Sequence, residues 1–364
     1  MDIPVFQLEA VSRPTLVIDE ARARRNIDRM AAKARASGVG FRPHVKTIQL
    51  PAVAEWLRAA GVAAITVSSL PMAERFAAAG WTDITVAFPF NPRDLPAANR
   101  LAGRIRLGIL LEDPAVAAAL ADGLNAPVDV WIKVDSGYGR TGIPWNDRNR
   151  LADLAQVVLD RPRLRLTGVL THAGHTYSAS NVATVRARFA ESCRRLDSAA
   201  EVVAAKKNGP VQRSVGDTPG CSTAPAFPGV EEIRPGNFVY FDLMQVGLGS
   251  CGVEDVAVAV ACPVVAVHRE RGEVVLCGGA VHLSRERMDG EAPFGRVWRR
   301  EGGGWGALST GRIVRQSQEH AVVADAEGAS RLAAGDLVLV APVHACLCAA
   351  CLGDAVMRIP AERQ

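Results

Sequence analysis

One lysine stands where a strand is expected to end, and its position suggests covalent chemistry. Lys46 closes an apolar stretch in the segment Arg-Pro-His-Val-Lys-Thr at 42–47. Partial desolvation there would disfavour the ammonium form and make the amine a better nucleophile toward a carbonyl group. A lysine that forms a Schiff base needs this property. An ordinary surface lysine fits the same segment, so the interpretation depends on the residues that the fold places around Lys46.

Two histidines form a second candidate group, in the segment Thr-His-Ala-Gly-His-Thr-Tyr at 171–177. His172 and His175 suit three roles: two metal ligands, a general base with its orienting partner, or hydrogen-bonded core histidines. The spacing alone does not decide among the three.

His344 and Cys346 are a sharper signal, because imidazole and thiolate both suit zinc. In an extended segment residues i and i+2 point to the same side, so we expect both side chains to meet one ion. Two protein ligands would leave positions on the metal open to substrate. Cys348 and Cys351 keep two alternatives open: a closed structural metal site that includes Cys346, or small buried core residues.

Two further stretches, 214–222 and 234–237, contain small residues, hydroxyls and exposed backbone N–H groups. After the last two strands of a barrel, such residues occupy the usual position of a phosphate site. Each stretch, considered alone, is also an ordinary Gly/Pro turn.

The strands that precede these residues must position them. Between 39 and 235, short β-branched runs alternate with segments of helical period, which is typical of parallel strands joined by crossover helices. Strands are predicted at 40–44, 63–68, 83–88, 105–111, 128–135, 164–172, 211–216 and 231–235. Eight alternating strands match a (β/α)8 barrel of the TIM type better than an open sheet. Active sites of such barrels lie at the carboxyl ends of the strands, where the candidates up to 237 stand.

The pattern changes after about residue 240, where strands are separated by glycine without a convincing helix. This predicts a second, all-β C-terminal domain, with strands at 256–269, 273–278, 294–299, 320–325, 336–341 and 355–359. An early strand at 15–19 precedes the first predicted helix and is expected to pair with the β domain. We therefore predict a barrel domain over 22–240 and a β domain built from 1–21 and 241–364.

The composition argues against several classes of partner. A net charge of +4 over 364 residues, without a run of five or six like charges, argues against a nucleic-acid or membrane surface. The longest apolar run, 256–267, has 12 residues and falls short of the roughly 20 that span a bilayer. The N-terminus lacks the pattern of a signal peptide, so we expect a cytoplasmic protein with reduced thiols and a small-molecule partner.

Together, the motifs resemble the fold-type III pyridoxal phosphate enzymes of the D-serine dehydratase and D-threonine aldolase group, which are relatives of alanine racemase. The resemblance covers nearly the whole chain, through the motifs at 14–19, 43–47, 172–177, 234–238, 240–242 and 344–346.

The resemblance implies that pyridoxal 5'-phosphate is bound through Lys46, with Arg234 beside the pyridine nitrogen. It implies a catalytic role for His172 near the cofactor and a head-to-tail homodimer. It also implies further contacts to the ring and the phosphate, from His44, Arg140, Tyr177, Ser214, Gly216, Thr218, Gly236 and Asn237.

The metal pair separates two activities within this group. Members that resemble D-serine dehydratase carry His-x-Cys for zinc, whereas D-threonine aldolases carry His-x-Asp with a harder ion such as manganese or magnesium. His344 and Cys346 therefore favour a dehydratase. Its expected substrate is a D-β-hydroxy amino acid such as D-serine or D-threo-3-hydroxyaspartate, and its products are a keto acid and ammonia.

The main alternative is an aldolase, in which His172 or His320 deprotonates the metal-bound hydroxyl and the Cα–Cβ bond breaks. That reaction gives glycine and an aldehyde. A cofactor-binding protein without turnover is less favoured, because such proteins resemble the barrel alone. A racemase is less favoured because racemisation needs no metal.

Overall fold

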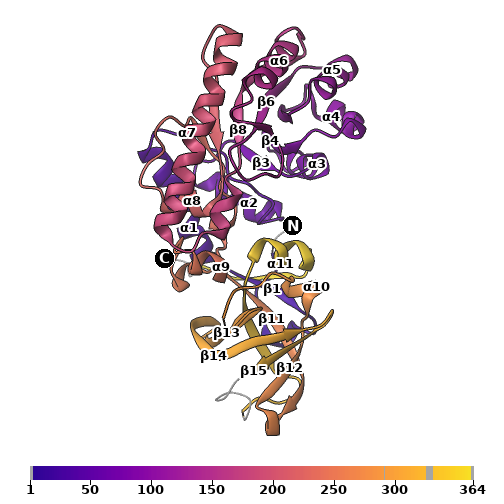
Figure 1. Cartoon of the computed structure of the whole chain (residues 1–364). Coiled ribbons are helices and arrows are strands. Elements are labelled where there is room, and N and C mark those ends of the chain that lie inside the picture. The colour runs from indigo at the N-terminus through magenta and orange to yellow at the C-terminus, as the bar shows by residue number, and fades with distance from the viewer. Residues whose placement is uncertain (1–2, 291, 325–330, 362–364) are drawn as a thin grey trace. The chain divides into compact units, whose positions relative to one another are not determined.

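The computed structural model describes residues 3–290, 292–324 and 331–361 (Figure 1). The chain divides into two compact units. The first, called the barrel unit, consists of Met30–Lys46 and Leu57–Gly236. The second, called the β unit, consists of Met1–Arg29, Thr47–Trp56 and Asn237–Gln364. A parallel sheet in one unit and a mainly antiparallel sheet in the other confirm the predicted fold class.

Eight parallel strands form the sheet of the barrel unit. They are β2 (Gly40–Phe41), β3 (Ile65–Val67), β4 (Asp83–Pro89), β5 (Arg106–Leu111), β6 (Val128–Asp135), β8 (Leu164–Thr171), β9 (Gln212–Val215) and β10 (Glu232–Ile233). Neighbours follow the order β2-β10-β9-β8-β6-β5-β4-β3, and a bridge between His44 and Thr66 joins the two ends. A short extra strand, β7 (Ile143–Pro144), pairs with β6. Each predicted barrel strand overlaps one of the eight, so the sheet is the expected TIM-type barrel.

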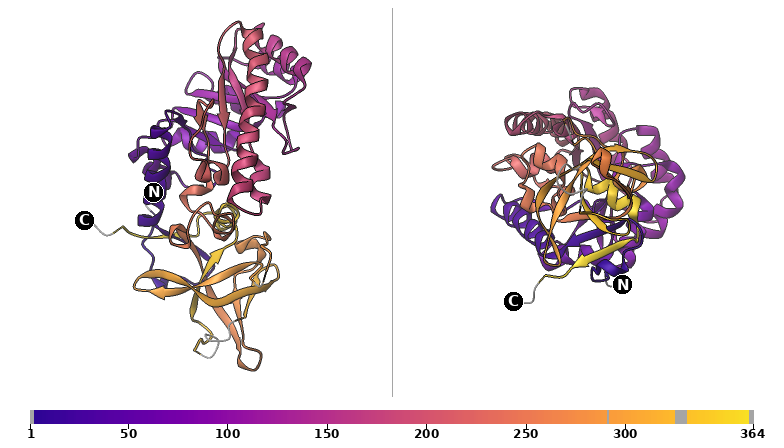
Figure 2. Two further views of the ribbon diagram at one scale, coloured as in Figure 1. Left: turned by 60° about the vertical axis from the view of Figure 1, so that its left-hand side comes forward. Right: turned by 90° about the horizontal axis from the view of Figure 1, so that it is seen from below.

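One helix precedes the first barrel strand, and the others lie in the connections between barrel strands. They are α1 (Glu20–Ala36), α2 (Pro51–Ala59), α3 (Leu70–Ala78), α4 (Leu95–Leu101), α5 (Pro114–Gly123), α6 (Arg148–Leu159), α7 (Val182–Lys207) and α8 (Thr218–Thr223). Several of these helices begin at a residue whose side chain caps the first turn. At the start of α7, for example, the Asn181 side chain accepts a hydrogen bond from the Thr184 amide. This long helix packs on β8 and β9 (Figure 2).

The barrel interior is packed with side chains. Leu110 on β5, Trp131 on β6 and Leu170 on β8 form a buried cluster inside it. None of the helices in the described residues is long and apolar enough to cross a bilayer.

The β unit contains an eight-stranded sheet in the order β12-β15-β14-β13-β16-β11-β1-β17. Its strands are β1 (Thr15–Asp19), β11 (Val258–His268), β12 (Glu273–Cys277), β13 (Gly295–Glu301), β14 (Gly304–Gln316), β15 (His320–Ala324), β16 (Leu337–Pro342) and β17 (Val356–Ile359). β1 pairs with β11 and β17, as expected for the early strand. Asp325, the last residue of one predicted strand, lies outside the described residues.

Two expectations for the β unit are wrong. No strand was predicted at β14, because its glycines interrupt the apolar alternation; at Gly311 a Cβ would lie 3.0 Å from Val297, so close strand contact favours glycine there. The unit also contains short helices, at α9 (Leu243–Gly247), α10 (Ala280–Leu283) and α11 (Ala345–Leu352). The segment around Cys346 was expected to be extended but is helical, because alanine and leucine favour the helix.

Close contact between β8 and β9 brings their carboxyl ends together, and Gly168 permits it. A Cβ at Gly168 would overlap the backbone carbonyl of Gln212 on β9. We expect Gly168→Ala to lower the free energy of unfolding by roughly 1 to 3 kcal/mol, because the strands must separate. Denaturant unfolding followed by circular dichroism measures this loss.

Gly209→Ala is the matched control, because a Cβ there meets no atom within 4 Å. Equal unfolding midpoints for the two variants would contradict the account of this strand pair.

Candidate active site

His172, directly after β8, is held by the backbone that follows β9. Its Nδ1 lies 2.6 Å from the carbonyl oxygen of Gly216. A carbonyl oxygen only accepts, so Nδ1 carries the proton and Nε2 keeps a free lone pair. Burial lowers the pKa of His172 well below its ordinary value, and the positive charges of Lys46, Arg140 and Lys133 add to this effect. His172 is therefore neutral, with an unprotonated Nε2.

Arg234, directly after β10, is buried inside the barrel unit and is 5% exposed. Its Nε donates to the Ser214 hydroxyl at 2.7 Å, and its Nη2 donates to the Thr171 carbonyl at 2.5 Å. Burial lowers the pKa of Arg234 to about 10, which still leaves the group cationic at neutral pH. The Ser214 hydroxyl, expected near a phosphate, is thus already engaged by Arg234.

Three other predicted phosphate residues lie together at the same end of the barrel. The Thr218 amide reaches the Tyr177 hydroxyl at 3.4 Å, and the Gly236 amide reaches the Thr218 hydroxyl at 3.3 Å. Both distances exceed those of a strong hydrogen bond, so a phosphate oxygen would be a better acceptor for these amides. Gly216 lies beside Arg234: a Cβ at Gly216 would be 2.7 Å from the Arg234 carbonyl oxygen.

Lys46 and His44 lie in the segment that follows β2. Lys46 is exposed, so the expected desolvation of its amine is not found; the residue lies in the turn after the strand, beyond the packed interior. His44 Nδ1 accepts a hydrogen bond from the Lys46 amide at 3.3 Å. Burial lowers the pKa of His44 well below its ordinary value, as do the charges of Lys46 and Arg234.

Lys133 on β6 is a site residue that the sequence analysis did not identify, because it lies within an apolar strand. It is 6% exposed, and its Nζ donates to the Val134 carbonyl at 3.0 Å. Burial lowers the pKa of Lys133 to about 7, and the charges of Arg234 and Arg140 contribute. Arg140 itself is exposed and lies over the Tyr138 ring. This concentration of positive charge favours an anionic ligand.

In the β unit, His344 caps α11 and Cys346 lies in its first turn. Their side chains lie close together, although the segment is not extended. Burial lowers the pKa of His344, but the neighbouring Cys346 side chain and the carboxylates of Asp242 and Glu286 raise it to about 9. The Thr47 hydroxyl lies 3.1 Å from the Cys346 sulfur. The helix start thus brings together the two predicted metal ligands.

Asp242, also missed as a site residue, anchors the helix that carries this pair. Its buried carboxylate accepts the Ala345 amide at 2.9 Å and the Gln245 amide at 2.9 Å. It also accepts the Asn237 side-chain amide at 2.5 Å. Asn237, expected near the phosphate, belongs to the β unit and donates to Asp242 there.

Several other candidates stand apart. His175 Nε2 lies 3.5 Å from the Ser192 hydroxyl. His320 is exposed at the start of β15, where it pairs with Cys277. In the part of the chain that the structure describes, no three His, Cys, Asp or Glu side chains are placed to hold one metal, which argues against a closed site with Cys348 and Cys351.

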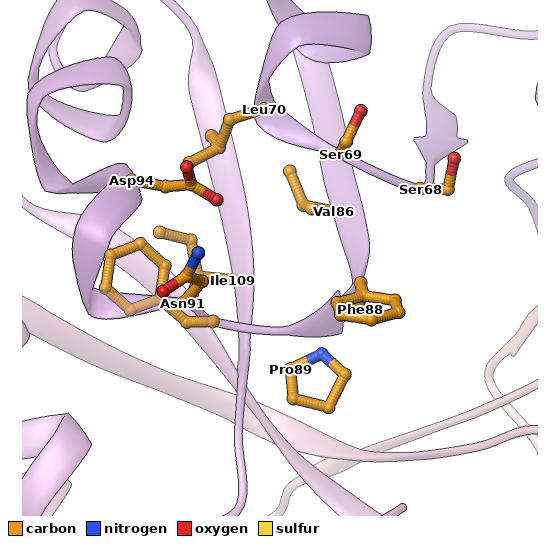
Figure 3. A pocket seen from close by; sticks show the side chains of 10 residues that line it. Ser68, Ser69, Leu70, Val86, Phe88, Pro89, Asn91, Asp94 and Ile109 are labelled. Atoms are coloured by element: carbon orange, nitrogen blue, oxygen red, sulfur yellow. The ribbon is translucent and has the colours of Figure 1, made fainter.

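The barrel unit also contains a pocket of ≈ 280 Å³ at the carboxyl ends of β3, β4 and β5 (Figure 3). It is lined by Ser68, Ser69, Leu70, Val86, Phe88, Pro89, Phe90, Asn91, Asp94 and Ile109. The lining includes none of the predicted site residues.

Family models cover most of the chain. A model described as alanine racemase, N-terminal domain, matches residues 18–244. A second model, described as a putative serine dehydratase domain, matches residues 257–357. The two matches follow one another along the chain and together include every predicted site residue.

Individual relatives agree with the family models. The chain is 34% identical to D-threo-3-hydroxyaspartate dehydratase of Delftia sp. (strain HT23), over 93% of this chain and 92% of that protein. It is 25% identical to D-serine dehydratase of Dictyostelium discoideum, over 94% of this chain and 92% of that protein. D-threonine aldolase of Arthrobacter sp. is 29% identical over only 53% of this chain and 50% of that protein.

Solved structures show the same relationship. The structure of the Delftia dehydratase has a TM-score of 0.87 with this chain at 33% identity, covering 96% of this chain and 94% of that chain. The chain therefore belongs to the alanine racemase N-terminal domain family, and its C-terminal part also matches the putative serine dehydratase domain.

Proposed function

We propose that this protein is a dehydratase that uses pyridoxal 5'-phosphate and a divalent metal to convert a D-β-hydroxy amino acid into a keto acid and ammonia. D-serine and D-threo-3-hydroxyaspartate are the candidate substrates. The observation that supports the proposal is the proximity of the His344 and Cys346 side chains at the start of α11, in the domain that matches the serine dehydratase model. The relatives that match over the whole chain support the same activity.

The barrel unit fits pyridoxal phosphate in its charges and donors. Lys46 would hold the cofactor aldehyde, and Arg234 would face the pyridine nitrogen with a buried guanidinium. The weakly engaged amides of Thr218 and Gly236, with the Tyr177 hydroxyl, suit a phosphate group. The positive charges that lower the pKa of His172 match the anionic phosphate and phenolate of this cofactor.

The β unit fits a soft divalent metal. His344 Nδ1 is buried and has no hydrogen-bond partner among the described residues, although its ring lies against the Cys346 thiol. One nitrogen and one sulfur ligand favour zinc over manganese or magnesium. A variant of a D-threo-3-hydroxyaspartate dehydratase has been solved in a metal-free form, which indicates that this relative binds a metal.

When bound, the cofactor supplies an electron sink that makes the substrate α-proton acidic, and the metal supplies a Lewis acid for the β-hydroxyl. Once the substrate amine has replaced Lys46 at the aldehyde, the freed Lys46 Nζ would be able to take the α-proton. His172, kept neutral by burial, offers Nε2 as a hydrogen-bond acceptor, while the Gly216 carbonyl fixes the ring through Nδ1. The β-hydroxyl would then leave as water, and hydrolysis of the released enamine would give the keto acid and ammonia.

Other sequence-based expectations stay predictions. These are the homodimer, the cytoplasmic location, the domain boundaries and the catalytic role of His320. Light scattering of the purified protein tests the homodimer directly.

Product analysis separates the dehydratase from the aldolase. We expect incubation with D-serine, D-threonine and D-threo-3-hydroxyaspartate to release ammonia and a keto acid from at least one substrate. Removal of the metal with a chelator should suppress this release, because hydroxide is a poor leaving group without a Lewis acid. Glycine and an aldehyde as the main products would show that the enzyme is an aldolase.

Asp242→Ala tests whether this carboxylate holds the metal pair in place. The change removes three buried hydrogen bonds, so we expect a loss of roughly 2 to 4 kcal/mol in the free energy of unfolding. We also expect the dissociation constant for zinc to rise about tenfold or more, because groups that orient ligands affect metal affinity. Calorimetric titration of the apoprotein measures the second effect.

Asp147→Ala is the control, because Asp147 caps α6 through a single hydrogen bond to the Arg150 amide. Its loss should cost about 1 kcal/mol and leave zinc affinity unchanged. Equal zinc affinity in the wild type and the Asp242 variant would show that Asp242 does not hold the metal ligands in place.

A further inference from the structure

We propose that Ser214 and Glu232 are positioning residues that fix the Arg234 guanidinium for the cofactor. This inference rests on the proposed function, since it concerns the group that faces pyridoxal phosphate. It assigns Ser214 a role through Arg234 in place of the expected contact with the phosphate. Glu232 receives a role that the sequence analysis did not foresee.

The three side chains form a continuous hydrogen-bonded chain inside the barrel. Ser214 Oγ accepts from Arg234 Nε at 2.7 Å and donates to Glu232 Oε1 at 2.6 Å. The exposed fractions of these residues are 5% for Arg234, 0% for Ser214 and 7% for Glu232. A serine hydroxyl can donate and accept at once, so it links the cation to the carboxylate.

The Glu232 end of this series of hydrogen bonds is also fixed. Glu232 Oε2 lies 2.6 Å from Arg42 Nε, and Arg42 Nη1 lies 2.5 Å from Asp83 Oδ1. The Glu232 carboxylate therefore has both oxygens occupied and cannot rotate without breaking a buried charged contact. Because Ser214 bonds to both Glu232 and Arg234, the fixed carboxylate also restricts the Arg234 guanidinium.

The bonds made by Arg234 leave one edge of the guanidinium for a ligand. Nε bonds to Ser214, and Nη2 bonds to the Thr171 carbonyl. Among the described residues, Nη1 makes no hydrogen bond. A planar guanidinium that is tied at two nitrogens has little freedom at the third, so Nη1 is preorganised.

Burial requires a compensating charge for Arg234, and the indirect contact with Glu232 supplies it. A buried guanidinium without a nearby anion is costly. In the described chain, no carboxylate forms an ion pair with Arg234, and Glu232 is the neighbour whose charge most favours its protonated form. The serine bridge thus stabilises the cation while its outer edge stays available.

The test uses the full-length protein with pyridoxal phosphate as the probe. We expect Ser214→Ala and Glu232→Gln to raise the dissociation constant for pyridoxal phosphate about tenfold or more. In both variants the Arg234 guanidinium, which would contact the cofactor, is no longer held in place. We also expect the absorbance maximum of the bound cofactor to shift, because the group that faces the pyridine nitrogen is no longer fixed. Titration of the apoprotein followed by absorbance measures both effects.

Asp129→Asn is the matched control. Asp129 is a buried carboxylate of the same barrel, 7% exposed, and it bonds to Arg106 and Arg165 without reaching Ser214 or Arg234. Asp129→Asn should lower the free energy of unfolding, while the cofactor affinity and the absorbance maximum stay at wild-type values. A purely structural role for Ser214 and Glu232 predicts that all three variants behave alike, and that result would overturn the proposal.

Ser214→Ala removes a single oxygen atom, so it decides the question if Glu232→Gln does not fold. Unchanged affinity and an unchanged absorbance maximum in Ser214→Ala would refute the positioning role. A wild-type protein that does not bind pyridoxal phosphate would instead refute the proposed function.

Discussion

A guanidinium buried inside a barrel is the constraint on which the candidate site depends. Arg234 is 5% exposed, and removing a charge from water is unfavourable unless hydrogen bonds and an opposite charge replace the water. The Thr171 carbonyl, the Ser214 hydroxyl and the charge of Glu232 do this. These three residues lie on β8, β9 and β10, so the closed strand order is what makes a fixed cation possible.

The same strand order explains the state of His172. The carboxyl ends of β8 and β9 bring its Nδ1 within 2.6 Å of the Gly216 carbonyl, which fixes the tautomer. Burial keeps the ring neutral, and the positive charges of Lys46 and Arg140 add to this effect. One barrel end thus combines a neutral acceptor with several positive charges, and such a site suits a cofactor that carries phosphate and phenolate groups.

The sequence was sufficient to predict the eight barrel strands and the pairing of the early strand, because β-branched runs and helical periods alternate clearly there. It did not predict α11, since a short apolar segment reads equally as strand or helix. It could not identify Glu232 or Asp242, because their roles depend on partners far away in the chain, such as Arg42 and Ala345. Lys133 was missed because it lies within an apolar strand, where a single lysine gives no distinct pattern. The expected desolvation of Lys46 is not found because Lys46 lies in a turn and is exposed to solvent.

The central claim is that Lys46 is joined to a vitamin B6 aldehyde in a protein that also holds a divalent metal. Its most direct test is the absorbance spectrum of the purified protein and of Lys46→Ala, with metal analysis of the same samples. The account predicts a cofactor band in the wild type, loss of that band in the variant, and bound zinc in both. A protein that is colourless, and stays colourless after incubation with pyridoxal phosphate, would contradict it.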